Sequence, residues 1–67
     1  MKLLDVVALT RPLPESGLAA GQVGTIVDVL AAEMFEVEFA DLDGHAYAIA
    51  PIAAADLLVL HHEAQAA

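Results

Sequence analysis

Short apolar runs separated by turn-forming residues predict an all-β protein. Residues 5–9 (Asp-Val-Val-Ala-Leu) form a β-branched run that ends before Pro12 and Pro14, neither of which can donate a hydrogen bond to a strand ladder. Residues 23–30 form a second strand-like run. In residues 35–39 (Phe-Glu-Val-Glu-Phe) apolar and acidic side chains alternate, as in a strand with one buried and one solvated face. We therefore predict a strand in each of these three segments.

The acidic residue within the second segment sets the expected faces of that strand. Asp28 should point to solvent, so its neighbours Val27 and Val29 are predicted to face the core. Ile26 would then lie on the outer face, together with Asp28.

Two connections set the expected topology. Residues 11–21 contain two prolines and two glycines and lack helical periodicity, which predicts a long surface loop from which Leu13 and Leu18 turn inward. Residues 41–44 (Asp-Leu-Asp-Gly) have the composition of a turn and predict a hairpin with a three-residue loop at 42–44.

That loop length fixes the expected register of the hairpin. It aligns Phe39 and Val37 with Tyr47 and Ile49 on the inner face of the sheet. The opposite register would bury three alanines of the second strand and would expose Tyr47 and Ile49 beside glutamates. We therefore expect the first register.

The C-terminal part supplies the last elements. After Pro51, residues 52–56 are too short for a stable helix and predict a single 3₁₀ turn before a final strand at 57–60. Five short strands, a long first loop, a central hairpin and this turn are the succession of a small five-stranded SH3-like barrel, whose closed sheet removes exposed edges. We predict a single domain over residues 1–60 and a frayed tail over residues 61–67.

Several motifs carry a more specific resemblance. The segment Gly21-Gln22-Val23-Gly24-Thr25-Ile26-Val27 is similar to the glycine-spaced second strand of ribosomal-type SH3-like barrels. From about Leu3 to Leu60 the chain resembles the bacterial family called domain of unknown function forty-nine twenty-six, through that segment and through Leu4-Asp5-Val6-Val7-Ala8-Leu9, Leu13-Pro14-Glu15, Gly17-Leu18, Glu36-Val37-Glu38-Phe39 and Asp43-Gly44. The resemblance implies a small stand-alone SH3-like protein, often encoded beside another small protein, and hence an antitoxin-like or accessory partner. It implies no functional residues.

Composition narrows the classes of partner and compartment. Ten acidic side chains against two basic ones give a formal charge of −8, which opposes the phosphate contacts that nucleic-acid binding requires. A hydrophobic content of 60% requires a packed domain, and the absence of cysteine leaves that domain without disulfides or thiolate metal sites. Asp5 interrupts the N-terminal apolar run that a secretory signal would need. Pro51 interrupts the longest apolar stretch, which is in any case too short to span a membrane. We expect a cytoplasmic protein that neither inserts into a membrane nor binds nucleic acid.

Two groups of side chains have the chemistry of metal ligands. Asp41, Asp43 and His45 lie at the expected hairpin tip, where two carboxylates could hold a hard cation, although aspartates in that position also stabilise turns through backbone amides. His61 and His62 are adjacent in sequence and would point to opposite faces of a strand. We favour a turn and a tail, and expect neither a metal nor a cofactor.

The chain shows no pattern typical of catalysis. Ser16 has no flanking strand and helix of the kind that presents a nucleophile, and no acid and base are paired by spacing, so we do not expect an enzyme. Met34, Phe35, Phe39 and Tyr47 could line a groove for a proline-rich peptide. The aromatic content of 4%, without tryptophan, favours their packing in the core instead.

A possible interaction face remains as the candidate site. An acidic face on neighbouring strands, flanked by apolar side chains, has the composition of an interface with a polar rim, although such a face can also be only solvated. The residues of this predicted face are Val6, Ile26, Asp28, Glu36 and Glu38.

The leading hypothesis for function is a non-catalytic module that binds a protein. The partner would be a basic protein encoded beside it, or a second copy of the chain, because so small a barrel cannot hide all of its apolar residues. Two alternatives remain: an acidic mimic of nucleic acid that inhibits a nucleic-acid enzyme, and a barrel that binds a small ligand or a metal.

Overall fold

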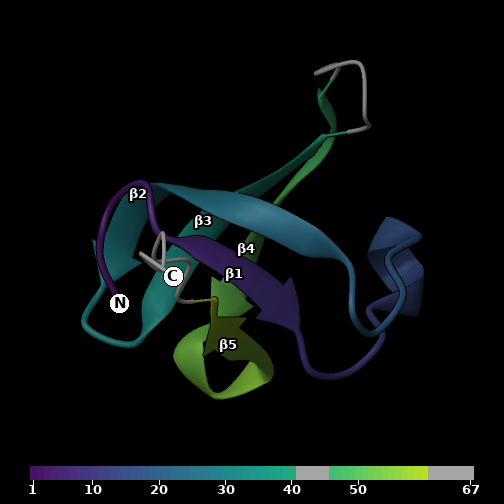
Figure 1. Ribbon diagram of the computed structural model, residues 1–67, viewed down its shortest axis with the longest axis horizontal. Helices are drawn as coiled ribbons and strands as arrows, with labels where there is room; N and C mark the ends of the chain where they lie inside the picture. Colours follow the sequence, from purple (N-terminus) through teal and green to yellow (C-terminus); the bar gives the residue numbers. More distant parts are fainter. Residues whose placement is uncertain (41–45, 61–67) are drawn as a thin grey trace, which may run out of the picture.

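A computed structural model describes residues 1–40 and 46–60 and shows a five-stranded antiparallel sheet (Figure 1). Its strands are β1 (Val6–Leu9), β2 (Val23–Ala31), β3 (Met34–Ala40), β4 (Ala46–Ala53) and β5 (Leu57–Val59). The 3₁₀ turn η1 (Pro14–Ser16) lies in the first loop, and η2 (Ala54–Asp56) joins β4 to β5. The predicted all-β class and the predicted 3₁₀ turn before the last strand are confirmed.

The predicted long first loop is present, and in the structure it folds back on itself. The N–H of Leu13 donates to the carbonyl of Leu18 at 2.8 Å, and the N–H of Leu18 donates to the carbonyl of Leu13 at 3.1 Å. Between them Gly17 has a φ of 70°, a left-handed conformation that glycine adopts without steric cost. Both leucines are buried, so the inward turn predicted for them is confirmed.

The faces predicted for β2 are wrong in part: Asp28 is exposed, as predicted, but Ile26 and the two valines beside Asp28 differ from the prediction. Ile26 is 0% exposed and pairs with Val37, whereas Val27 and Val29 are exposed. The cause is a register shift between Ile26 and Asp28, where one extra residue of β2 bulges out of the ladder with β3. Because the bulge reverses the alternation, Ile26 faces the core and Asp28 faces solvent, a combination that an unbroken strand does not allow.

The register predicted for the hairpin of β3 and β4 is also wrong. Ala40 pairs with Ala46, but Phe39 pairs with Ala48, so β4 advances by two residues where β3 advances by one. This shift leaves Ala50 buried and Ile49 55% exposed beside Glu38, the register that we had not expected. The predicted loop at 42–44 lies outside the described residues.

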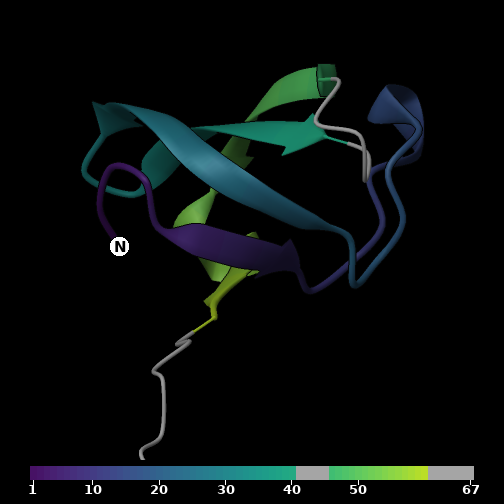
Figure 2. The same cartoon turned by 45° about the horizontal axis from the view of Figure 1, so that its top comes forward.

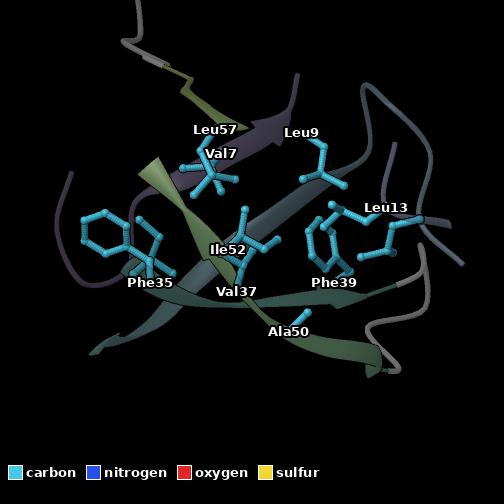
Figure 3. Packing of buried hydrophobic residues seen from close by; sticks show 11 residues of the cluster. Val7, Leu9, Leu13, Phe35, Val37, Phe39, Ala50, Ile52 and Leu57 are labelled. Carbon is cyan, nitrogen blue, oxygen red and sulfur yellow. The ribbon is translucent and has the colours of Figure 1, made fainter. Parts of the chain in front are cut away.

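The core fills the concave side of the sheet. In Figure 2 the long strand β2 runs between β1 and β3, and the sheet bends along it. In Figure 3, Val7 and Leu57 lie across from Val37 and Ile52. The buried cluster consists of Val7, Leu9, Leu13, Leu18, Ile26, Phe35, Val37, Phe39, Ala50, Ile52 and Leu57.

The closed barrel predicted from the sequence is not confirmed. In the described chain the strand order is β4-β3-β2-β1-β5, which leaves β4 and β5 as the two edges of the sheet. Two features oppose a continuous ladder between these edges. Pro51 in β4 has no N–H to donate, and β5 is only three residues long.

Close packing against β3 explains the glycine of β2. A methyl group at Gly24 would lie 2.7 Å from Val37 Cγ1 and 2.8 Å from the carbonyl oxygen of Glu38. The glycine therefore lets β2 approach β3 where both strands cover the core.

Among the described residues, no helix is long and apolar enough to cross a membrane.

Candidate functional site

The side of the sheet away from the core carries both apolar and acidic side chains, and we call it the outer face. Strand register places one row across it, since Val6 pairs with Thr25, Thr25 with Glu38 and Glu38 with Ile49. The outer face consists of Val6, Ala8, Val23, Thr25, Asp28, Glu36, Glu38, Ile49, Pro51 and Leu58.

A second row of this face is acidic. Asp28 of β2 pairs directly with Glu36 of β3, and like charges placed opposite each other destabilise a sheet. Both basic side chains of the protein are engaged elsewhere. Lys2 Nζ lies 2.8 Å from Asp5 Oδ1, and Arg11 Nε lies 2.9 Å from Asp56 Oδ1. A cationic group from another molecule would therefore relieve the repulsion across this row.

The third row is apolar. Ala8 of β1 pairs with Val23 of β2 on one side and with Leu58 of β5 on the other. Val23 is exposed and Leu58 is 58% exposed. Exposed apolar side chains thus extend from β5 across β1 and β2, next to the row that contains Glu38.

An N-terminal turn lies at the end of this face. The N–H of Asp5 donates to the carbonyl of Lys2 at 3.1 Å, and the hydrogen bond from the Lys2 ammonium lowers the pKa of the Asp5 carboxyl. Leu4 has a φ of 71° and is 71% exposed, and its N–H donates to the carbonyl of Ile26 at 2.7 Å. A leucine in the left-handed region is strained, yet its side chain contributes little to the core.

Four of the five residues of the predicted interaction face lie on the same side of the sheet. They are Val6, Asp28, Glu36 and Glu38, which belong to the outer face. Ile26 does not belong to it, because the bulge in β2 turns this side chain into the core.

The large exposed aliphatic residues Val23, Ile49 and Leu58 of the outer face were missed from the sequence. Ile49 was assigned to the core through the register that the structure corrects. The exposure of Val23 and Leu58 follows from alternation with the buried Gly24 and Leu57. That alternation could have been recognised in the sequence.

The other candidate residues are not brought together. Phe35 and Phe39 are buried in the core, as favoured from the sequence, while Met34 is partly exposed. The side chain of Tyr47, the residues 41–45 of the hairpin tip and the histidines at 61–62 lie outside the described residues.

A groove opens beside the first loop. It has a volume of about 420 Å³. Its lining consists of residues 50–53 of β4, Met34, Asp56 and, from the first loop, Arg11, Leu13, Glu15 and Ser16. The loop is tied to η2 at this place, because the N–H of Thr10 donates to the Asp56 carbonyl at 2.9 Å. The hydrogen bond with Asp56 also raises the pKa of Arg11.

Comparison with known families identifies the chain. Residues 3–59 match the family described as Domain of unknown function (DUF4926). The match covers most of the sequence, so the chain belongs to this family, as the motifs in its sequence indicated. Comparisons with curated proteins and with solved structures found no significant match.

Proposed function

We propose that this protein is a non-catalytic interaction module that binds a basic protein through the outer face. One observation carries the proposal: exposed apolar side chains from β1, β2, β4 and β5 share one face with three carboxylates. An apolar centre with a polar rim is the usual composition of a protein interface. With 60% hydrophobic residues, the chain has more apolar side chains than its small core buries.

The charge of the chain favours a basic partner over a second copy. Two copies meeting through the outer face would bring two sets of Asp28, Glu36 and Glu38 together, each in a chain of formal charge −8. Complementary charge accelerates association, whereas opposed like charges cost several kcal/mol in a close interface. The family resemblance, which implies a neighbouring small protein, agrees with a partner of this kind.

We also infer that the fold is of the SH3-like type. The long first loop, the pairing of β5 with β1 and the 3₁₀ turn between β4 and β5 support this inference. In this interpretation the core side chains, rather than backbone hydrogen bonds, hold the two edges of the bent sheet near each other.

The proposal is tested by capture from the native lysate with the tagged wild-type chain and with two outer-face variants, Leu58→Lys and Glu38→Lys. The first variant places a cation in the apolar row, and the second reverses a charge of the rim. We expect the wild type to capture a stoichiometric basic protein, identified by mass spectrometry, and both variants to lose it. The same protein captured equally by all three chains, or an acidic protein, would contradict the proposal.

Salt and oligomeric state separate the remaining alternatives. A complex that persists in part at high salt fits an apolar interface, whereas complete loss at high salt favours the acidic mimic of nucleic acid. Light scattering of the wild type alone should give a monomer. A dimer that Leu58→Lys dissociates would show that the outer face binds a second copy.

A further inference from the structure

The groove beside the first loop follows the edge of β4 rather than one face of the sheet. Successive side chains of a strand point to opposite faces, yet four consecutive residues, 50–53, line this groove. A hollow in contact with all four must run along the side of the strand. The strand order agrees, since β4 is an edge of the sheet with β3 as its neighbour.

The size and floor of the groove suit part of a polypeptide. Its volume of about 420 Å³ lies within the range of roughly 300–1,000 Å³ that is common for binding sites. Leu13, Ala50 and Ile52 contribute a buried apolar floor, and the partly exposed Met34 lies at the wall.

The rim of the groove carries excess negative charge. Arg11 forms an ion pair with Asp56, with 2.9 Å between Nε and Oδ1. The hydrogen bond and the charge of Asp56 raise the pKa of Arg11, and the nearby charge of Glu15 adds to this effect. One cation therefore lies among two carboxylates, in a chain whose formal charge is −8. A second cation fits this rim better than an anion does.

We propose that this groove binds an extended basic segment of another protein. An arginine or lysine of the segment pairs with Glu15 and Asp56, and aliphatic or small side chains pack against Met34 and Pro51. Pro51 lacks an N–H, so it interrupts any backbone ladder along β4, and side-chain contacts hold the segment. This site shares only Pro51 with the outer face, and its existence does not depend on the function proposed for that face.

The test begins with a library of random peptides displayed on phage and selected on the full-length chain. Enriched peptides are synthesised, and their binding is measured by fluorescence anisotropy and by amide chemical shifts of the protein. We expect enriched sequences that place arginine or lysine beside aliphatic residues or proline. Chemical-shift changes should centre on β4, η2 and the first loop.

Matched variants then locate the site. Glu15→Lys and Met34→Lys should each weaken peptide binding about tenfold or more, because they oppose the basic residue and obstruct the groove. Glu38→Lys and Val23→Lys make the same changes of charge on the outer face and should alter peptide binding less than twofold. Amide spectra of all four variants verify that they are folded.

Three results would overturn the proposal: no enrichment, enriched peptides without a basic residue, or equal weakening by the outer-face variants. Capture from the lysate with the groove variant Glu15→Lys separates failure of this proposal from failure of the outer-face proposal. Loss of a captured protein from Glu15→Lys but not from Leu58→Lys would refute the outer-face proposal and leave the groove supported. Loss of the captured protein from Leu58→Lys but not from Glu15→Lys, together with an unsuccessful peptide selection, would refute the groove proposal and support the outer-face proposal.

Discussion

The inner and outer faces of the same sheet differ in what their apolar side chains do. On the inner face, Val37 and Ile26 are fully buried, and Gly24 leaves no room for a methyl group. On the outer face, Ile49 and Leu58 are more than half exposed. Burial of an aliphatic side chain stabilises a fold by about 1.5–3 kcal/mol, and exposure forgoes most of that gain. The buried side chains of the inner face therefore account for the stability of the domain. The exposed apolar side chains of the outer face contribute little to that stability, so their presence requires another reason, such as contact with a second molecule.

Two isoleucines allow the sharpest comparison of the faces. Ile26→Ala removes a fully buried side chain and should lower the free energy of unfolding by about 2–5 kcal/mol. Ile49→Ala, on the outer face, should change it by less than about 0.5 kcal/mol. Urea unfolding followed by circular dichroism measures both. If Ile26→Ala is unfolded without urea, Ile26→Val gives a smaller loss of about 0.5–1.5 kcal/mol. Equal losses at the two positions would contradict the assignment of faces.

Gly24 tests how tightly the inner face is packed. Gly24→Ala forces a methyl group against Val37 and the Glu38 carbonyl and should destabilise the fold by about 1–3 kcal/mol. Gly24→Ala in a Val37→Ala background should cost less, because the shorter side chain makes space. Additive losses, obtained from a double-mutant cycle of urea midpoints, would show that the contact with Val37 is not the cause.

Substitution of Leu4 tests whether its left-handed backbone conformation lowers the stability of the fold. Glycine at this position relieves a left-handed conformation that costs about 1–2 kcal/mol and adds about 0.5–1 kcal/mol of chain entropy to the unfolded state. Leu4→Gly should thus stabilise the fold by up to about 1.5 kcal/mol. Leu3→Gly, in the same turn, is the control and should not stabilise it. Thermal unfolding of the two variants gives the comparison, and a lower melting temperature for Leu4→Gly would contradict the strain.

The smallest expected effect concerns Asp5. Its pKa is lowered in the folded chain by the hydrogen bond from Lys2, so ionised Asp5 favours the folded state above pH of about 4. That contribution disappears as the pH falls through the folded-state pKa. The melting temperature of the wild type should therefore decrease below pH 4 slightly more steeply than that of Asp5→Asn. Lys2→Gln should reduce the slope in the same way, and an unchanged slope in both variants would contradict the role of this pair.

The sequence predicted the elements of the fold better than their faces. Local patterns were sufficient for the strands, for the inward leucines of the first loop and for the turn before β5. Two register shifts reversed faces relative to the prediction. The first follows Ile26 and changes the faces of β2, and the second lies between Phe39 and Ala40 of β3 and changes the faces of the paired strand β4. A bulge depends on how two paired strands pack together against the same core, and no single residue near these shifts predicts it.

The candidate sites show the same limit of sequence reasoning. Val6, Asp28, Glu36 and Glu38 were placed on one face because strand alternation is a local property. Ile26 and Ile49 were each assigned to the opposite face for a common reason, the register shifts. The groove was not predicted at all, because it forms where the first loop, β4 and η2 approach one another at the opening of the sheet.

Pro51 has a consequence for how this protein behaves at high concentration. A free edge strand beside an apolar hollow is a template on which further chains can add, and uninterrupted addition leads to fibrils. Pro51 has no N–H to donate and lies near the middle of the part of β4 that lines the groove. A strand added at this edge therefore cannot form a complete ladder of hydrogen bonds with β4. Pro51 therefore opposes polymerisation along this edge, and the net charge of −8 acts in the same direction.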